Sequence, residues 1–237
     1  MVGQKNVGVI FLLGMFLAIS FSCGDSGNGD AVDAAPDAEV IPHKDDILAL
    51  LNHSCDDDLM SPYEAVVKPA GEEPLDLRGT IIRCAYEKRI SPEQLTAEME
   101  ALTDRFKIPV FDRALHKLRI SYWTTRGENS ESVVVTSASV YIPEERKVDP
   151  SPVIIVAHGS VGIADRCAPS LDGEGKHEEE WKPPQYTLAN QGWIVLAPDF
   201  PGLGTPGIHA WMHSPDEGRS MLDGTRAAND LFKTDSI

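Results

Sequence analysis

The sequence lacks the features that mark several classes of protein. No apolar run reaches the roughly 20 residues that a membrane-spanning helix needs, since the longest, Val7 to Phe21, is shorter. Basic side chains are scarce: 21 lysines and arginines stand against 37 acidic residues, and the net charge is −16. Because nucleic acid is bound by a basic stripe, this balance excludes nucleic acid as an expected partner. There is also no internal repeat.

Metal-binding patterns are weak as well. The acidic runs Asp56-Asp57-Asp58 and Glu178-Glu179-Glu180 lack the alternating ligand spacing of a calcium loop, so we interpret both as solvated faces. His209 and His213 have the i, i+4 spacing of a zinc-binding pair, but the prolines on either side disfavour a helix there. We therefore expect neither a metal ion nor another cofactor.

What is present begins with an export signal at residues 1–22. A short polar start precedes the apolar run Val7 to Phe21, whose length suits the core of a signal peptide. The following Ser20-Phe21-Ser22-Cys23 resembles a bacterial lipobox, which implies that the cysteine is lipidated and becomes the new N-terminus. We predict export with Cys23 anchored in the outer membrane; the alternative is secretion with Cys23 as a free thiol.

Composition then divides the rest of the chain. Residues 23–42 are small and acidic, and such a segment buries too little apolar surface to offset the entropy lost on ordering. We predict that they form a disordered tether, followed by an N-terminal helical subregion at 43–112 and a further unit at 113–237.

The cysteines point to one disulfide bond. With Cys23 set aside, Cys55, Cys84 and Cys167 remain, an odd number for an oxidising compartment. Spacing alone does not fix the pairing. We predict a Cys55–Cys84 bond because both residues flank the same subregion, and this leaves Cys167 as a free thiol.

Local patterns predict two elements before residue 150. Ser91 is a helix N-cap, with Pro92 at the first helical position and Gln94 completing a capping box. From Leu118 to Pro143, apolar residues alternate on either side of a glycine-containing turn, which predicts an antiparallel hairpin. The apolar stripe expected on the helix consists of Leu95, Met99, Leu102 and Phe106.

The pattern changes after residue 150. Val153 to Ala157 and Trp193 to Ala197 are continuous apolar runs, typical of strands buried on both faces of a mostly parallel sheet. Pro184 to Gln191 predicts a helix between them, closed by Gly192. A second capping box, Ser214 to Glu217, predicts the start of a last helix, whose expected apolar face is Met221, Leu222, Ala228, Leu231 and Phe232.

The first buried run leads directly into the turn His158-Gly159-Ser160-Val161-Gly162. Glycines there let the backbone turn sharply at the carboxyl end of a strand, where open α/β sheets place their ligands. The N–H groups freed by such a turn can point at a developing negative charge. A tight turn without a catalytic role is the alternative for this pentapeptide alone.

The second buried run leads into Ala197-Pro198-Asp199-Phe200-Pro201-Gly202-Leu203-Gly204. Together with Arg166 to Ser170 and Gly218 to Ala228, this segment resembles the secretory lipase branch of the α/β-hydrolase superfamily over roughly residues 120–232. The resemblance implies an incomplete α/β-hydrolase fold, a mostly parallel sheet with flanking helices, of which 113–237 is the N-terminal part. It implies an oxyanion hole at the Ser160 N–H, supported by His158, Gly159 and Gly162, with His158 structural. It also implies ester or lipid substrates.

The chain departs from that superfamily in having no Gly-x-Ser-x-Gly elbow for a nucleophile. Ser160 follows His158 at the spacing where Gly is required, and Ser220 lacks the second Gly. We therefore expect no catalytic residue within this chain; the serine, acid and histidine would lie beyond Ile237. The full-length protein is predicted to be a lipase-like carboxylic ester hydrolase and the given chain inactive. The alternative is a non-catalytic cell-surface lipoprotein on a hydrolase scaffold.

Overall fold

The computed structural model describes residues 11–12, 44–68, 73, 75–102, 107–127, 132–148, 150–171, 178–233 and 237. Their strands form one sheet with the order β1-β5-β6-β4-β3-β2. The strands are β1 (Phe11–Leu12), β2 (Ile81–Ile90), β3 (Leu115–Arg126), β4 (Ser132–Pro143), β5 (Val153–Val156) and β6 (Ile194–Pro198). The α-helices are α1 (Lys44–Leu48), α2 (Pro92–Leu102), α3 (Glu178–Asn190) and α4 (Ser214–Leu231), with 3-10 turns at Ser61–Tyr63, Asp165–Cys167 and Pro169–Leu171.

The sheet is mixed. β5 and β6 are parallel neighbours with α3 between them along the chain, as the two apolar runs predict. β3 and β4 form the predicted antiparallel hairpin. However, β4 pairs antiparallel with β6, and β2 antiparallel with β3. The expectation of a mostly parallel sheet is therefore wrong for the described strands, because the hairpin and β2 make one half of the sheet antiparallel.

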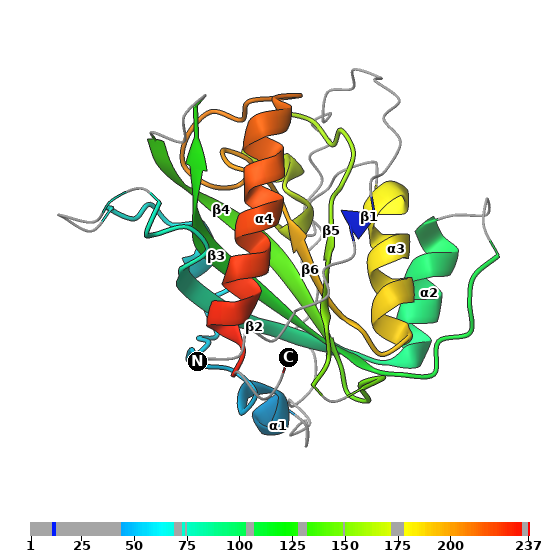
Figure 1. Ribbon diagram of the computed structural model, residues 1–237. Coiled ribbons are helices and arrows are strands. Elements are labelled where there is room, and N and C mark those ends of the chain that lie inside the picture. The colour runs from blue at the N-terminus through cyan, green and yellow to red at the C-terminus, as the bar shows by residue number, and fades with distance from the viewer. Residues whose placement is uncertain are drawn as a thin grey trace.

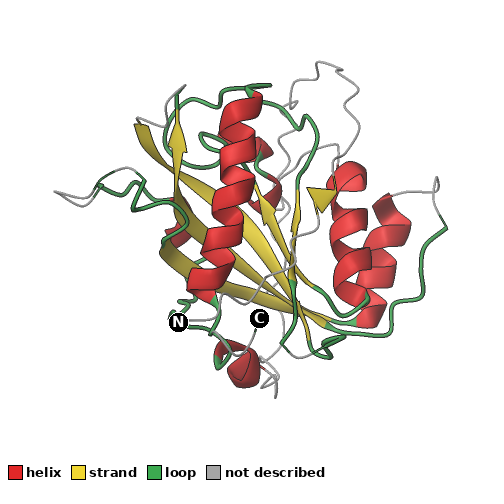
Figure 2. Ribbon diagram, viewed as in Figure 1, coloured by secondary structure: helices red, strands yellow, loops and turns green. Residues whose placement is uncertain are grey.

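Helices cover both faces of this sheet (Figures 1 and 2). On one face α4 and α1 pack on side chains such as Ile120, Val140 and Leu196. On the other face α2 and α3 pack on Tyr141 and Val195. The structure thus has the three layers, helix, sheet and helix, that a sheet buried on both faces requires. Among the described residues no helix has the length and apolar character needed to cross a membrane.

The segment 43–112, predicted to be helical, contains helices α1 and α2 but also the strand β2, which was not predicted. This strand lies at the edge of the sheet and pairs only with β3 among the named strands. Its charged residues and irregular pairing with β3 suit an edge, where polar side chains and bulges discourage further pairing. They also remove the clean alternation by which a strand is predicted from sequence.

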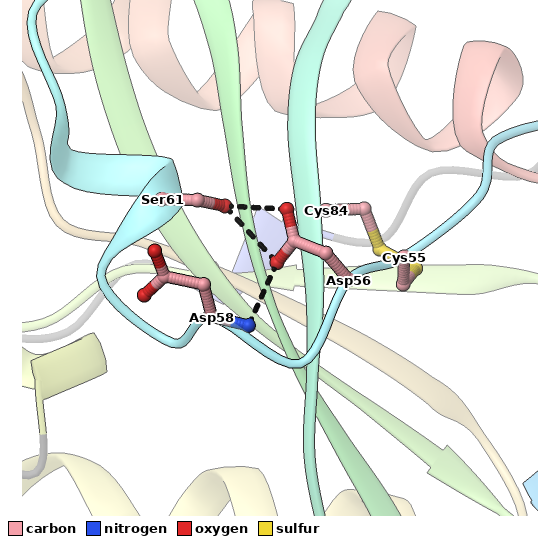
Figure 3. The surroundings of a disulfide bond; sticks show 5 residues. All are labelled: Cys55, Asp56, Asp58, Ser61 and Cys84. Atoms are coloured by element: carbon pink, nitrogen blue, oxygen red, sulfur yellow. Dashed lines mark hydrogen bonds between the residues drawn. A yellow bond between two sulfur atoms is a disulfide. The ribbon is translucent and has the colours of Figure 1, made fainter.

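The predicted disulfide between Cys55 and Cys84 is present and fastens the preceding loop to β2 (Figure 3). The bond closes a loop with a sequence separation of 29, which corresponds to a stabilisation of about 3.6 kcal/mol in the chain-entropy account. Beside it, the Asp56 carboxylate accepts hydrogen bonds from the Ser61 hydroxyl and from the backbone N–H of Asp58. This part of the acidic run therefore builds a turn as well as facing solvent.

The prediction that Cys167 is a free thiol is wrong. It is disulfide-bonded, to a partner outside the described residues. The tether 23–42 and Cys23 also lie outside those residues. Of the predicted signal peptide only β1 is described, as a two-residue parallel pairing with β5.

Of the two capping boxes predicted from the sequence, the one at α2 is present and the one at α4 is not. The capping box of α2 is confirmed: the Gln94 N–H donates to Ser91 Oγ at 3.3 Å, and the Ser91 N–H donates to Gln94 Oε1 at 2.8 Å. The second capping box is wrong, because Ser214 is already helical and His213 is the N-cap, without a side-chain cap. His213 instead lies 3.2 Å from Asp216.

The buried face of α4 is more polar than predicted. Leu222, expected in the core, is 47% exposed, whereas Asp223 is fully buried. The Asp223 carboxylate accepts hydrogen bonds from Arg78, Thr124 and Arg226 at 2.7 to 2.9 Å. These partners compensate for the desolvation of its charge, which is the condition for burying a carboxylate.

Helix α3 begins six residues before its predicted start and includes Pro183 and Pro184. The predicted start at Pro184 is wrong, because both prolines stand inside the helix. Its predicted end is confirmed. The N–H of Gly192 donates to Ala189 O at 2.9 Å and that of Trp193 to Leu188 O at 3.3 Å, the two bonds of a Schellman cap.

Gly192 provides a direct test of this cap. It has φ +88°, and an added Cβ would lie 2.6 Å from the backbone nitrogen of Lys147. Gly192→Ala is therefore expected to lower the free energy of unfolding by at least about 1 kcal/mol. The measurement is urea-induced unfolding followed by circular dichroism.

Gly218 is the matched control, because it lies inside α4 with nothing within 4 Å of an added Cβ. Gly218→Ala should leave stability unchanged or raise it by up to about 1 kcal/mol. Equal effects of the two substitutions would contradict the assigned cap.

Candidate functional site

The carboxyl ends of β5 and β6 meet at one edge of the sheet, and a cleft lies beside them. Because the two strands are parallel neighbours, the turns that follow them, residues 157–162 and 199–205, start side by side. The cleft is small, with a volume of about 20 Å³, below the range of about 300–1,000 Å³ that is usual for ligand sites. Its lining residues are His158, Gly159, Ser160, Val161, Gly162, Phe200, His209, Trp211, Met212 and Glu217.

All four residues predicted for the oxyanion turn, His158, Gly159, Ser160 and Gly162, therefore line one cleft. Within the described part of the chain, no acceptor takes the backbone N–H of Ser160. The Ser160 hydroxyl is instead the acceptor of a hydrogen bond from Trp211 Nε1, at 3.4 Å. The Ser160 residue thus lines the cleft with a backbone N–H that no described residue accepts.

His158 connects the two turns. Its Nδ1 lies 2.6 Å from Gly159 O and its Nε2 lies 3.1 Å from Asp199 O. Its ring centroid is 4.6 Å from that of Phe200. Both ring nitrogens face backbone carbonyls, so His158 holds the first turn against the second.

Asp199 is the centre of a buried hydrogen-bond network that sequence analysis missed. Its fully buried carboxylate accepts hydrogen bonds from Ser137 Oγ at 2.6 Å and from the Ser170 N–H at 2.8 Å, and it also contacts Ser170 Oγ. The Tyr63 hydroxyl lies 2.6 Å from Ser170 Oγ. We call Asp199, Ser137, Ser170 and Tyr63 the Asp199 network. It joins β4, two 3-10 turns and the turn that follows β6.

The network has a marked electrostatic character. Burial raises the pKa of the Asp199 carboxyl above its ordinary value, and the hydrogen bonds from Ser137 and Ser170 oppose that rise. Burial also raises the pKa of Tyr63, so its hydroxyl keeps its proton. An acidic residue directly after a fully apolar strand was the available signal, since such a residue must either find donors or stay neutral.

Residues with a strained backbone line the same cleft. Among the described residues, only Phe200 and Met212 have positive φ without being glycine, at 73° and 59°. Both line the cleft. Bulky residues in this region cost about 1–3 kcal/mol each, and such strain is typical of functional sites.

A glycine makes the second turn possible. Gly202 has φ +75°, and an added Cβ would lie 2.5 Å from the backbone carbon of Ile208. The turn after β6 therefore packs directly against the segment that carries Trp211 and Met212. The glycine of the Asp-x-x-Gly pattern is required for this close approach.

Two further titratable groups line the cleft. Burial lowers the pKa of His209, whose Nδ1 lies 3.2 Å from Pro201 O. Burial raises the pKa of Glu217, in the first turn of α4, and charge on His158 opposes that rise. Neither was predicted to belong to the oxyanion turn, because their distance from residue 158 in the sequence hides their proximity in the fold.

The remaining predicted sites lie elsewhere. Cys55 and Cys84 are at β2, which is separated from β5 in the sheet by β6, β4 and β3. His209 and His213 do not share a helix, since α4 begins at Ser214. Among the residues that the structure describes, no group of three or more potential ligands could hold a metal ion.

The raised pKa of Asp199 leads to a test of the network. A folded-state pKa above the unfolded value means that ionisation favours unfolding, so the contribution of Asp199 falls as the pH rises through that interval. Asn is uncharged and can still bond to the two serine hydroxyls. The stability of Asp199→Asn relative to the natural chain should therefore increase between pH 4 and pH 7, as measured by urea unfolding at each pH.

Asp199→Ala is the companion variant, because it leaves the donors of Ser137 and Ser170 unsatisfied. Each buried unsatisfied donor costs about 1–3 kcal/mol, so this variant should be destabilised across the same range. A stability difference for Asp199→Asn that falls with rising pH would contradict the assignment.

Comparison with known proteins concerns the fold. No family model matches the chain, and no curated protein does. Among solved structures, the rice cell wall degrading esterase LipA from Xanthomonas oryzae is 22% identical, with a TM-score of 0.47 over 64% of this chain and 37% of that chain. A candidate hydrolase from Legionella pneumophila is 15% identical, with a TM-score of 0.50 over 63% and 38%.

Candida antarctica lipase A in its closed state is 17% identical, with a TM-score of 0.40 over 65% of this chain and 32% of that chain. The chain thus spans little more than a third of the length of the first two proteins. The strand order, the helices on both faces and the similarity to the Legionella structure show that this chain has an α/β-hydrolase-like fold.

Proposed function

We propose that this chain is the N-terminal part of an exported serine hydrolase that acts on carboxylic esters. The observation that carries the proposal is the Ser160 N–H, which has no acceptor among the described residues and belongs to a turn lining a cleft at the carboxyl end of β5. In an α/β-hydrolase fold, that position suits the stabilisation of an oxyanion.

The proposed reaction is acyl transfer through a serine ester. A serine oxygen attacks the ester carbonyl carbon, and its proton passes to a general base. The carbonyl oxygen becomes an oxyanion that accepts a hydrogen bond from the Ser160 N–H. Collapse breaks the bond to the alcohol oxygen, which takes the proton, and water then releases the acid. One such donor contributes about 3 kcal/mol to stabilisation of the transition state.

We propose that the serines near the cleft are not the nucleophile. Ser220 is fully buried and donates its hydroxyl to Asp216 O at 3.1 Å. Ser170 belongs to the Asp199 network, and Ser160 Oγ accepts the bond from Trp211. We therefore propose that the nucleophile, acid and histidine come from residues beyond Ile237. The outer edge of β5 pairs only with two-residue β1 among the described strands and offers a position for a further strand.

Fluorophosphonate labelling tests this arrangement. Residues 24–237 should not react with the probe, because an oxyanion donor without a nucleophile does not support covalent catalysis. Protein expressed from the whole reading frame should be labelled on a serine encoded after codon 237, within a Gly-x-Ser-x-Gly sequence. Mass spectrometry of the labelled peptide identifies that residue.

Two results would contradict the proposal. Labelling of Ser160 in residues 24–237 would show that a complete site exists within the given chain. A reading frame that ends at codon 237, with no labelling, would instead favour a non-catalytic surface lipoprotein on the same scaffold.

The location is a second part of the proposal. Signal-peptide cleavage before Cys23 would leave the lipidated cysteine at the N-terminus, with residues 24–42 as the spacer from an outer membrane. Gly24 in place of Asp after the cysteine supports outer-membrane sorting. Cys23 is the one cysteine of this sequence left to pair with Cys167, so lipidation of its sulfur and the disulfide of Cys167 exclude each other, and the proposed lipidation holds only if that disulfide does not form.

Metabolic labelling with an alkynyl fatty acid distinguishes lipidation of Cys23 from a disulfide at Cys23. The natural chain should incorporate the label and Cys23→Ala should lose it, while Cys55→Ser serves as a control that keeps the label. A non-reducing peptide map that links Cys23 to Cys167 would contradict lipidation of the sulfur and would leave plain secretion.

A further inference from the structure

Among the described acids of the buried and half-buried regions, Glu217 differs from most, Asp199 apart, in having no lysine or arginine partner. Asp216, Asp223 and Glu87 each pair with arginine or lysine at 2.6 to 3.1 Å. Glu217 forms no ion pair with lysine or arginine in the part of the chain that the structure describes. Its carboxylate accepts a hydrogen bond from the Met212 N–H, and burial raises its pKa. The fold therefore places on the wall of the cleft an acid that has no lysine or arginine partner among the described residues, although charge on His158 acts on it.

The other walls at this place are aromatic and apolar. Trp211 and Phe200 line the cleft, and Trp211 is 43% exposed, so part of its ring is available to a ligand. The hydrogen bond from Trp211 Nε1 to Ser160 Oγ fixes the indole beside the oxyanion turn. Met212, held with positive φ, connects Trp211 to the Glu217 carboxylate.

The histidines near Glu217 either favour the neutral form or have other partners. Burial lowers the pKa of His209, which favours its neutral form. His158 has both ring nitrogens at backbone carbonyls, and His213 lies 3.2 Å from Asp216. Glu217 is the acidic residue among those that line the cleft, so it is the group there that can oppose the charge of an entering cation. The net charge of −16 would also favour the approach of a cation over that of an anion.

An aromatic face beside a carboxylate is the arrangement that binds substituted ammonium groups. We propose that this cleft recognises a trimethylammonium-type cation on the ester substrate, with Glu217 supplying the opposite charge and Trp211 the ring face. The inference rests on the proposed hydrolase function, since it names the substrate class of the same cleft. It makes Glu217 a specificity-determining residue.

A pair of isosteric probes isolates the charge. Choline and 3,3-dimethylbutan-1-ol have the same shape, but only choline carries a positive charge. Isothermal titration of the full-length protein should show choline binding at least about tenfold more tightly than the neutral alcohol. Equal affinities would overturn the proposal.

Variants of Glu217 and Trp211 test whether these residues recognise choline. Glu217→Gln should remove the preference for choline, whereas Glu100→Gln, an exposed acid on α2, should keep it. Trp211→Ala should weaken choline binding and Trp211→Phe should restore most of it, because Phe keeps an aromatic face. Thermal unfolding of each variant distinguishes lost recognition from lost folding. A preference that survives in folded Glu217→Gln would overturn the assignment.

The outcome separates this inference from the proposed function. Fluorophosphonate labelling without a preference for choline would leave the hydrolase and remove its cationic substrate. A Glu217-dependent preference for choline without labelling would leave an ammonium-binding cleft and remove the hydrolase.

Discussion

The arrangement of the cleft depends on one buried carboxylate. Asp199 accepts hydrogen bonds from Ser137 in β4 and Ser170 in a 3-10 turn, and its own carbonyl lies against His158 Nε2. These contacts fix the turn after β6 and, through His158, the turn after β5. Through Ser170 they reach Tyr63. The N-terminal subregion, which matches no α/β-hydrolase pattern in the sequence, is in this way fastened to the turn that carries the Ser160 N–H.

The energetically unfavourable features of this arrangement lie at or beside the cleft. Asp199 and Glu217 are acids whose pKa values burial raises, and Phe200 and Met212 hold unfavourable backbone conformations. Elsewhere the fold follows ordinary rules, such as the Schellman cap at the end of α3 and the carboxylate of Asp223 held by two arginines. Strained backbone and shifted pKa values concentrated at one place are typical of binding and catalytic sites.

Patterns of short range were predictable from the sequence and long-range partners were not. The hairpin, the two apolar strands, the Ser91 capping box and the end of α3 each depend on residues a few positions apart. Strand β2 was missed because charged side chains at a sheet edge hide its alternation. Leu222 was misplaced because ion pairs from distant segments bury Asp223 in the core instead. Glu217 reaches the oxyanion turn only through the fold.

The central claim is that the Ser160 N–H stabilises the oxyanion of an ester substrate. A crystal structure of the full-length protein after reaction with a diethyl phosphonate tests it directly, because the phosphonyl oxygen mimics that oxyanion. The account predicts this oxygen within about 2.7–3.1 Å of the Ser160 backbone nitrogen. A phosphonyl oxygen more than about 3.5 Å from that nitrogen, and bound to other donors, would contradict it.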